Sequence, residues 1–416
     1  ESGIDNIPLS PEAKKERTIE ALKKITLGGS EIRPLIMATE DLHWMDKTSG
    51  EFLQYLIDSL TGTRILLILL YRPEYVHPWG SKTYYTKIGL DQLGSSSSAE
   101  LVQAILDDGK AVPEIKNLVL SKAGGNPLFV EEITHSLLEN GSIIKKDHEY
   151  ILTRKASDIE VPDTIQGIIS ARLDRLEKEA KRILQEASVI GRAFLYEILK
   201  RITELKEQID RSLQGLERLD LIRTRTLDPD LEYIFKHALT QEVVYNGLLK
   251  KERQVIHEKV AHVMEDLFRE RLSEFYETLA YHYKQGQSYL KAVDYLMKAG
   301  AKCLERYTVE ESHQYYKEAF DILSNRTDRS KDEDTLLMDL LIQWSPVYSF
   351  RADYGGLEDL QKRHETFVRS SGDNTRLGMF LAWLGWTLNQ REKYLDSYRY
   401  LSQALEIGER INNSKI

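Results

Sequence analysis

The strongest constraint on the fold of this chain is a pair of aliphatic runs, residues 34–39 and 64–71. Neither run alternates between apolar and polar residues, which is typical of parallel strands buried on both faces. Residues 49–60, between them, carry apolar side chains at helical spacing. Strand, helix and strand in this order predict a right-handed crossover unit. We expect a helix over 11–25 before it, begun by a serine cap, and a weaker third strand at 87–90.

Both runs end in charged residues: Glu40 and Asp41 follow the first, and Arg72 follows the second. Parallel strands share one carboxyl edge, and ligands of open parallel sheets bind beyond it, so we expect these side chains to meet there. Adjacent carboxylates repel each other unless a cation compensates. Phosphoryl-transfer sites combine a magnesium-holding acid, a residue that orients water, and an arginine on the γ-phosphate. The alternatives are that the acids cap the next helix and that Arg72 is a surface side chain.

Beyond the strands, helical patterns dominate the chain. Residues 96–160 contain helices and a short hairpin, and 161–270 contain helices with two weak strands, the order of a winged helix. Residues 271–416 repeat a helix pair with small residues at regular positions, which is typical of tetratricopeptide repeats. We therefore predict a mainly α protein with an N-terminal α/β portion (1–95), a helical lid, a winged-helix-like domain and a helical solenoid.

Composition and net charge limit the kinds of partner that the chain can bind. Net charge is −9 and the pI about 5.7, so no strong basic field attracts nucleic acid or anionic lipid. The longest aliphatic run, Ile65–Leu70, is too short to cross a bilayer, and no signal peptide opens the chain. The single cysteine, Cys303, fits a reducing compartment. These features predict a cytoplasmic protein that contacts no membrane and does not favour nucleic acid.

Four strings occur in a specific order: EDLHWMD (40–46), LLILLYRPEY (66–75), GGNPLFVEEI (124–133), and a long one that begins FKHALTQEVVY (235–245). With the repeats that follow, the chain resembles the signal-transduction ATPases with numerous domains (STAND, AAA+-like). More narrowly, it is similar to the bacterial ATPases that follow class III nucleotide cyclase or protein kinase domains. The resemblance implies part of a P-loop NTPase core with Walker B and sensor strands, and ATP/ADP and Mg²⁺ as cofactors.

Carried over by residue, the resemblance implies that Glu40 holds magnesium or its water and that Asp41 orients the hydrolytic water. Arg72 would sense the γ-phosphate. Asn126 and Pro127 would lie against the nucleotide base, with a plain helix start as the alternative. His237 would touch the β-phosphate of ADP, with a core or surface histidine as the alternative. Within the first string, we expect Trp44 to be mostly packing and Asp46 to cap a helix.

A phosphate-binding loop, G-x-x-x-x-G-K-[ST], is absent; the nearest string, Leu27–Ser30, lacks the lysine. The resemblance implies that this loop precedes residue 1 in a longer polypeptide. Without it the fragment should bind ATP poorly, and ATP hydrolysis is expected only of the parent. The implied partners are an upstream effector domain in the same polypeptide and a protein bound to the repeats.

Two rival interpretations remain. The chain could be a protein-interaction scaffold whose nucleotide site is degenerate. It could instead be a DNA-binding regulator, since winged helices often read the major groove. The modest basic clusters, residues 250–253 with Arg223 and Arg225, are better explained as solvated surface.

Overall fold

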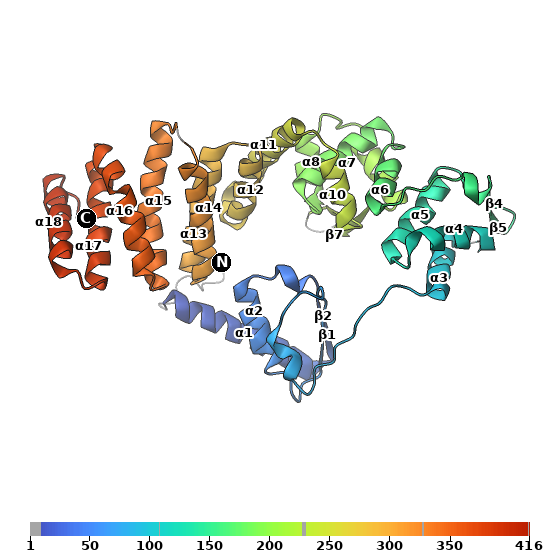
Figure 1. Ribbon diagram of the computed structural model, residues 1–416, viewed down its shortest axis with the longest axis horizontal. Helices are drawn as coiled ribbons and strands as arrows, with labels where there is room; N and C mark the ends of the chain where they lie inside the picture. The colour runs from blue at the N-terminus through green and yellow to red at the C-terminus, as the bar shows by residue number, and fades with distance from the viewer. Residues whose placement is uncertain (1–9, 108, 227–229, 327, 415) are drawn as a thin grey trace. The chain divides into compact units, whose positions relative to one another are not determined.

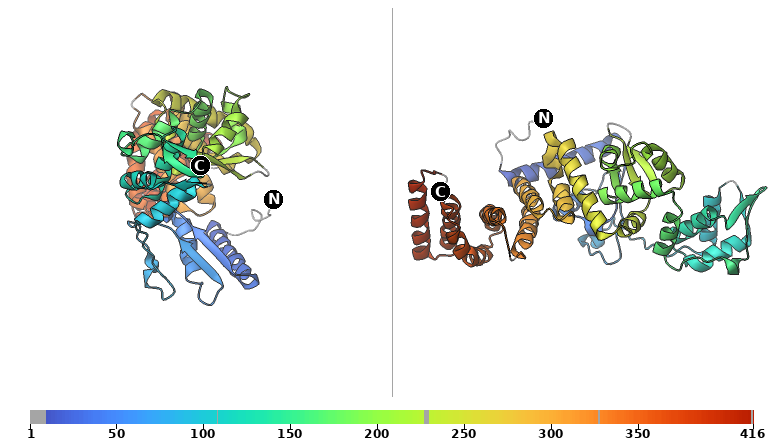
Figure 2. Two further views of the ribbon diagram at one scale, coloured as in Figure 1. Left: turned by 90° about the vertical axis from the view of Figure 1, so that its right-hand side faces the viewer. Right: turned by 90° about the horizontal axis from the view of Figure 1, so that it is seen from above.

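The computed structural model describes residues 10–107, 109–226, 230–326, 328–414 and 416 (Figures 1 and 2). It is mainly helical with three small sheets, which confirms the predicted fold class. The chain divides into two compact units: residues up to 87 with 270–284 and 288–416, and residues 88–269 with 285–287. None of the described helices is long and apolar enough to cross a membrane.

The N-terminal α/β portion begins with helix α1 (Pro11–Ile32), whose cap Ser10 accepts a hydrogen bond from the Ala13 N–H at 3.2 Å. The helix continues past the predicted end at residue 25, through Gly28 and Gly29. Each glycine costs a helix about 1 kcal/mol, which lowers local helix propensity without ending the helix. In this last turn Ser30 is 2% exposed and its carbonyl accepts from the Arg64 side chain at 3.0 Å, so contacts with distant residues outweigh the local signal.

The predicted crossover is present. Strands β1 (Leu35–Thr39) and β2 (Ile65–Leu69) pair in parallel, Leu35 opposite Ile65 and Thr39 opposite Leu69, with helix α2 (Lys47–Ile57) between them in sequence. One face of the pair packs in a small core, formed by Leu42, Leu53, Ile57 and Trp79 with Leu67 and Leu69.

The expectation that both faces are buried is wrong for the described residues. Side chains alternate along each strand, and Ile36 and Leu66 on the open face are 72% and 57% exposed. An unalternated run permits two buried faces but does not supply the second covering layer. Residues 87–90, predicted as a third strand, have no regular secondary structure, because so short an apolar run specifies a strand only when a neighbouring strand pairs with it.

The predicted lid contains helices α3 (Ser95–Leu106), α4 (Pro113–Ala123) and α5 (Pro127–Glu139). Strands β4 (Ile143–Lys146) and β5 (Glu149–Leu152) form the predicted hairpin, and β3 (Lys110–Ala111) pairs in parallel with β5. These elements share one apolar core, which includes Val102, Ile115, Val119, Ile133 and Leu137.

The following segment contains α6 (Ile165–Leu173), α7 (Lys178–Ile190), α8 (Tyr196–Ile202), α9 (Ile209–Arg218), α10 (Ala238–Asn246) and α11 (Lys250–Leu267). Strands β7 (Ile222–Thr226) and β8 (Glu232–Phe235) form the predicted antiparallel pair. A third strand, β6 (Ala193–Leu195), pairs with β8 and was not predicted, because three residues are too few to show a period.

One buried arginine joins this segment to the lid. Arg172 of α6 is 3% exposed, and its guanidinium donates to Glu132 at 2.7 Å and to Glu139, both on α5. A further N–H donates to the Leu219 carbonyl at 2.9 Å. The charge is therefore paired with two carboxylates, which is the condition for keeping an ion buried.

The C-terminal helices are α12 (Tyr276–Gln285), α13 (Tyr289–Glu305), α14 (Val309–Ser324), α15 (Lys331–Phe350), α16 (Tyr354–Ser370), α17 (Asn374–Gln390) and α18 (Tyr394–Arg410). Four of their connections use the same turn. In each, one residue has a positive φ and the next N–H donates to a carbonyl five residues earlier, which is a Schellman-type helix end. The residues with positive φ are Gln287, Tyr307, Ala352 and Glu392.

Small residues let the paired helices approach closely. The Ser312 hydroxyl of α14 donates to the Gly300 carbonyl of α13 at 2.7 Å, and Ser397 of α18 donates to Gly385 of α17 at 2.8 Å. A Cβ added at Gly300 would lie 2.7 Å from the Tyr316 ring. The helix pairs α13–α14 and α17–α18 are thus built alike, whereas the sequence pattern matched residues 279–299, in α12 and α13, with 384–404.

We predict that Gly300→Ala destabilises the solenoid although alanine is the better helix former. The added methyl meets a ring that is itself fully buried, and such overpacking costs about 1–3 kcal/mol. The matched control is Gly28→Ala in α1, where nothing lies within 4 Å of the added Cβ and a gain of up to about 1 kcal/mol is expected. Melting temperature and amide exchange of the α13–α14 peptides measure both. Equal effects of the two substitutions would contradict the close packing.

Candidate functional site

The carboxyl edge of β1 and β2 carries the predicted acids and arginine. The parallel ladder continues past the strands, since the Leu70 N–H donates to the Thr39 carbonyl at 2.9 Å and the Leu42 N–H to the Leu70 carbonyl at 3.2 Å. Glu40 and Asp41 therefore leave the sheet from the same edge as Arg72. All three residues are exposed.

The backbone turns sharply at Asp41, which has φ 57° and ψ 38°. Few non-glycine residues adopt this left-handed conformation, and aspartate is among those that tolerate it best. The turn leads into a short 3₁₀ helix, η2 (Leu42–Trp44), in which Leu42 is buried and fixes the segment to the core. The Asp41 side chain makes no capping hydrogen bond to this helix.

Asp46 is the helix cap, as predicted. Its carboxylate accepts from the Ser49 N–H at 2.9 Å and from the Ser49 hydroxyl at 2.6 Å, at the start of α2. Burial alone would raise the pKa of Asp46, but the hydrogen bonds from Ser49 outweigh it and the pKa is lowered. Capping of α2 is thus done by Asp46, which leaves Glu40 and Asp41 available for another role.

The expectation that Trp44 is mostly packing is wrong, because its indole is 70% exposed. The anchoring position of this turn is taken by Leu42, and Trp44 points out at the carboxyl edge. The Arg72 guanidinium lies 6.0 Å from the Trp44 ring centroid, and the His43 ring lies 4.8 Å from it. Both nitrogens of His43 are buried and have no hydrogen-bond partner among the residues described.

In the lid, Asn126 and Pro127 form the start of α5. The Asn126 side chain accepts from the Phe129 N–H at 3.2 Å, and Pro127 occupies the first helical position. Asn126 and Pro127 therefore form a plain helix start, the alternative to a base contact. Both residues are exposed, and their contact with a nucleotide base stays a prediction.

His237 stands at the N-terminus of α10, and its Nε2 lies 3.1 Å from Glu131 Oε2 of α5. The same carboxylate binds the Lys236 ammonium, which also binds Asp220. Hydrogen bonding to His237, and then to Lys236, outweighs burial and lowers the pKa of Glu131 to about 2. The imidazole predicted to touch a phosphate is thus paired with a carboxylate.

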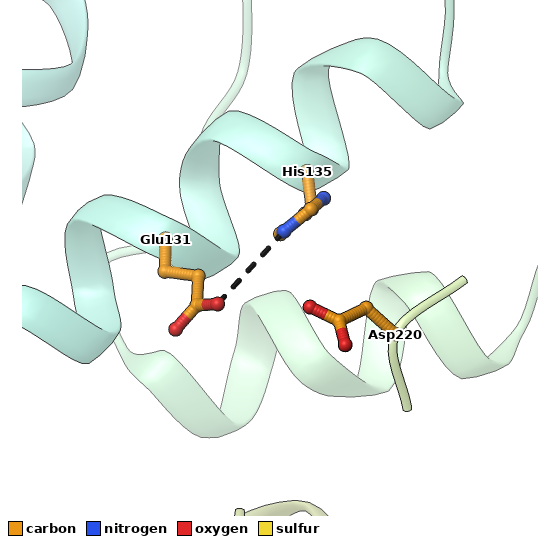
Figure 3. A group of neighbouring side chains, drawn as sticks. All are labelled: Glu131, His135 and Asp220. Atoms are coloured by element: carbon orange, nitrogen blue, oxygen red, sulfur yellow. Dashed lines mark ion pairs between the residues drawn. The ribbon is translucent and has the colours of Figure 1, made fainter. Parts of the chain in front are cut away.

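Glu131, His135 and Asp220 (Figure 3) bring ligand atoms within 4.8 Å of one another, close enough to hold a metal ion. Lys236, however, contacts both carboxylates and already supplies the compensating cation. Burial, with Arg172 and Lys236 nearby, lowers the pKa of His135. We therefore interpret the cluster as an ion-pair network. Neither Glu131 nor Lys236 was predicted from the sequence as a site residue, although Lys236 is the neighbour of His237.

Comparisons with known proteins identify no family. No family model matches the chain. A Rhizobium meliloti (strain 1021) protein described as "Uncharacterized protein R02095" is 24% identical over 339 residues, covering 79% of this chain and 32% of that protein. The chain thus spans about a third of this relative's length.

Two solved structures show a limited similarity to this chain, with low sequence identity and low TM-scores. A Signal Transduction ATPase with Numerous Domains (STAND) protein with a tetratricopeptide repeat sensor from Pyrococcus horikoshii is 13% identical, with a TM-score of 0.40, over 96% of this chain and 65% of that one. BtubC (BKLC) from P. vanneervenii is 12% identical, with a TM-score of 0.31, over 76% of this chain and 91% of that one. Superpositions this loose assign neither a fold nor a function.

We predict that Glu131→Gln destabilises the unit of residues 88–269 at neutral pH by on the order of 2 kcal/mol. A carboxyl whose pKa is lowered on folding stabilises the fold above its unfolded pKa and loses that contribution as pH falls through its folded pKa. The difference from the unsubstituted chain should therefore narrow between about pH 5 and about pH 2. Urea unfolding at several pH values measures it.

The matched control is Glu160→Gln, an exposed acid of the same unit. Surface changes of this kind alter stability by less than about 0.5 kcal/mol. A gap between Glu131→Gln and the control that stays constant with pH would mean that the carboxylate gains nothing from His237 and Lys236.

Proposed function

We propose that the chain belongs to a signal-transduction ATPase and acts in it as an ATP/ADP conformational switch. The observation that carries the proposal is the carboxyl edge of β1 and β2, where two neighbouring acids and an arginine leave adjacent parallel strands. The order of the four strings quoted above supports the same class. Among the described residues, neither the Glu40 nor the Asp41 carboxylate is engaged by a cation of the chain.

In this proposal Glu40 holds a magnesium ion or its water, and Asp41 orients the attacking water. Magnesium would supply charge compensation for the two acids and for the phosphates. Arg72 would reach the γ-phosphate, because a guanidinium binds phosphate oxygens with two parallel N–H groups. Trp44, exposed beside Arg72, adds an aromatic face to the same edge.

The phosphate cradle must come from elsewhere, since the 416 residues contain no G-x-x-x-x-G-K-[ST] loop. We place it, with the ATP hydrolysis that requires it, in the longer polypeptide. The relative that matches this chain is about three times as long as the matched region, which leaves room for such a segment and for an effector domain.

The switch itself would couple the nucleotide to the lid and the winged-helix-like segment. Asn126 and Pro127 would contact the base, and His237 would exchange Glu131 for the β-phosphate of ADP. Exchange of ADP for ATP would give Arg72 a new partner and change which of these contacts are made. The proposed partners are an effector domain, a cyclase or kinase, in the same polypeptide and a protein bound to the repeats. The proposed location is the cytoplasm.

A scaffold without nucleotide chemistry is the second candidate, favoured by the helical repeats, since helical solenoids commonly present protein-binding surfaces. A DNA-binding role has less support. Arg223 lies 3.1 Å from Asp220 and Arg225 lies 3.4 Å from Glu232, so both arginines of strand β7 have acidic partners.

We predict that Arg72→Ala, in the polypeptide that includes the phosphate loop, lowers the preference for ATP over ADP by about tenfold or more and leaves ADP affinity within about twofold. Only ATP carries the γ-phosphate that Arg72 would contact, and a charge-assisted hydrogen bond is worth about 1.5–3 kcal/mol. Titration with fluorescent ATP and ADP in the presence of Mg²⁺ measures both affinities.

The control is Arg33→Ala, which removes an exposed arginine from the opposite, amino edge of the same strands. Unchanged ATP preference in Arg72→Ala, or equal effects at residues 33 and 72, would contradict the sensor role.

Glu40→Gln should keep nucleotide binding and lose Mg²⁺-dependent hydrolysis. No nucleotide binding by the unsubstituted polypeptide would favour the scaffold.

A further inference from the structure

The outer face of helix α18 carries a row of exposed apolar side chains. Tyr394 is 63% exposed, Leu395 90%, Tyr398 76% and Leu405 60%, and Leu401 lies between them at 41%. Residues 394, 398, 401 and 405 are spaced at one turn of helix each, so they form a continuous stripe. Stripes of this kind on a water-soluble surface mark a place where another element packs.

Helix α14 shows what covers this face elsewhere in the same solenoid. The pairs α13–α14 and α17–α18 match position by position: Gly300 with Gly385, and Ser312 with Ser397, each pair joined by the same hydroxyl-to-carbonyl bond. Their turns match too, with positive φ at Tyr307 and at Glu392. Any residue of α18 can therefore be assigned its counterpart on α14.

The counterparts of the exposed stripe are covered by the next helix of the chain, α15. His313 accepts from the Trp344 indole N–H at 3.3 Å, and its ring lies 5.3 Å from that of Tyr348. The Phe320 ring lies 5.7 Å from that of Trp344. In the matching frame His313 corresponds to Tyr398 and Phe320 to Leu405.

One further position agrees. Glu310 accepts a hydrogen bond at 3.3 Å from Arg351, the residue that follows α15, and Glu310 corresponds to Leu395. Tyr316 and Leu401 also correspond, but each lies against the glycine of the preceding helix, Gly300 and Gly385, and so does not report on α15. The face of α18 is thus the one that receives α15 in the earlier pair, with its polar members replaced by apolar ones.

We propose that the stripe of α18 is covered by a further helix of the same polypeptide, which packs on it as α15 packs on α14. The succession from α14 to α15 favours a helix that follows in the chain. The relative's much greater length allows such a continuation. Since Leu395 replaces Glu310, the partner of Arg351, the added segment carries an apolar side chain at the position that matches Arg351, just after the incoming helix.

The experiment compares thiol reactivity at Tyr398→Cys and Leu405→Cys in a Cys303→Ser background. The control is Glu406→Cys, because its counterpart Asp321 stays exposed with α15 in place. Each variant is made in the 416-residue chain and in the polypeptide extended through its next repeat, about 34 residues. Native cysteines of the extension are replaced by serine.

All three thiols should react at similar rates in the 416-residue chain. In the extended polypeptide, those at 398 and 405 should slow by about tenfold or more, as expected of side chains exposed only by local opening, while the one at 406 is unchanged. Equal rates at 398 and 406 in the extended polypeptide would overturn the proposal. So would protection in the 416-residue chain that increases with protein concentration, since a second copy would then cover the stripe.

Discussion

Parallel pairing of β1 with β2 is the constraint on which the candidate site depends. In an antiparallel pair the two chains leave from opposite edges, and Arg72 would lie a strand's length away from Glu40 and Asp41. The parallel register requires a crossover, which α2 provides, and α2 in turn needs the cap that Asp46 supplies. The acid that caps the helix, Asp46, and the acids at the carboxyl edge of the strands, Glu40 and Asp41, are thus different residues, although they lie within seven residues of one another. That division leaves two carboxylates at the edge without a structural task.

Features set by residues close in sequence could be predicted. The strands, the crossover helix, the Asp46 cap and the small-residue pattern of the repeats each follow from a period or a turn of a few residues. The failures have a common physical origin in contacts with distant residues. The open face of the sheet and the exposure of Trp44 depend on which layers pack nearby, and no period in the sequence encodes the presence or absence of a covering layer. Strand β6 exists because β8 pairs with it, and its three residues carry no signal of their own.

The candidate site shows the same limit. The sequence predicted that His237 matters, but it could not show that Glu131, more than a hundred residues earlier, binds the ring. Because of that contact, the His237 ring is paired with a carboxylate and is not free to contact a phosphate. The nitrogens of a histidine and a lysine that hold a carboxylate are also of the kind that hold a phosphate, so in the proposed switch a phosphate would replace Glu131 there. The lowered pKa of Glu131, about 2, means that this carboxylate stays charged over the physiological pH range.

The repeats show how one sequence rule produces two different surfaces. The inner faces of α14 and α18 are built alike: a serine bonds a glycine carbonyl of the preceding helix, and a large side chain, Tyr316 or Leu401, lies against that glycine. Their outer faces differ, since each is shaped by what lies against it. On α14 the polar groups His313 and Glu310 are hydrogen-bonded, His313 to Trp344 of α15 and Glu310 to Arg351, which follows α15. On α18 the corresponding side chains are Tyr398 and Leu395, of which the leucine can satisfy no polar partner. An aliphatic side chain at that position is stabilised only by burial of its apolar surface. Leu395, at 90%, has the highest exposed fraction of the large apolar side chains among the described residues of the solenoid.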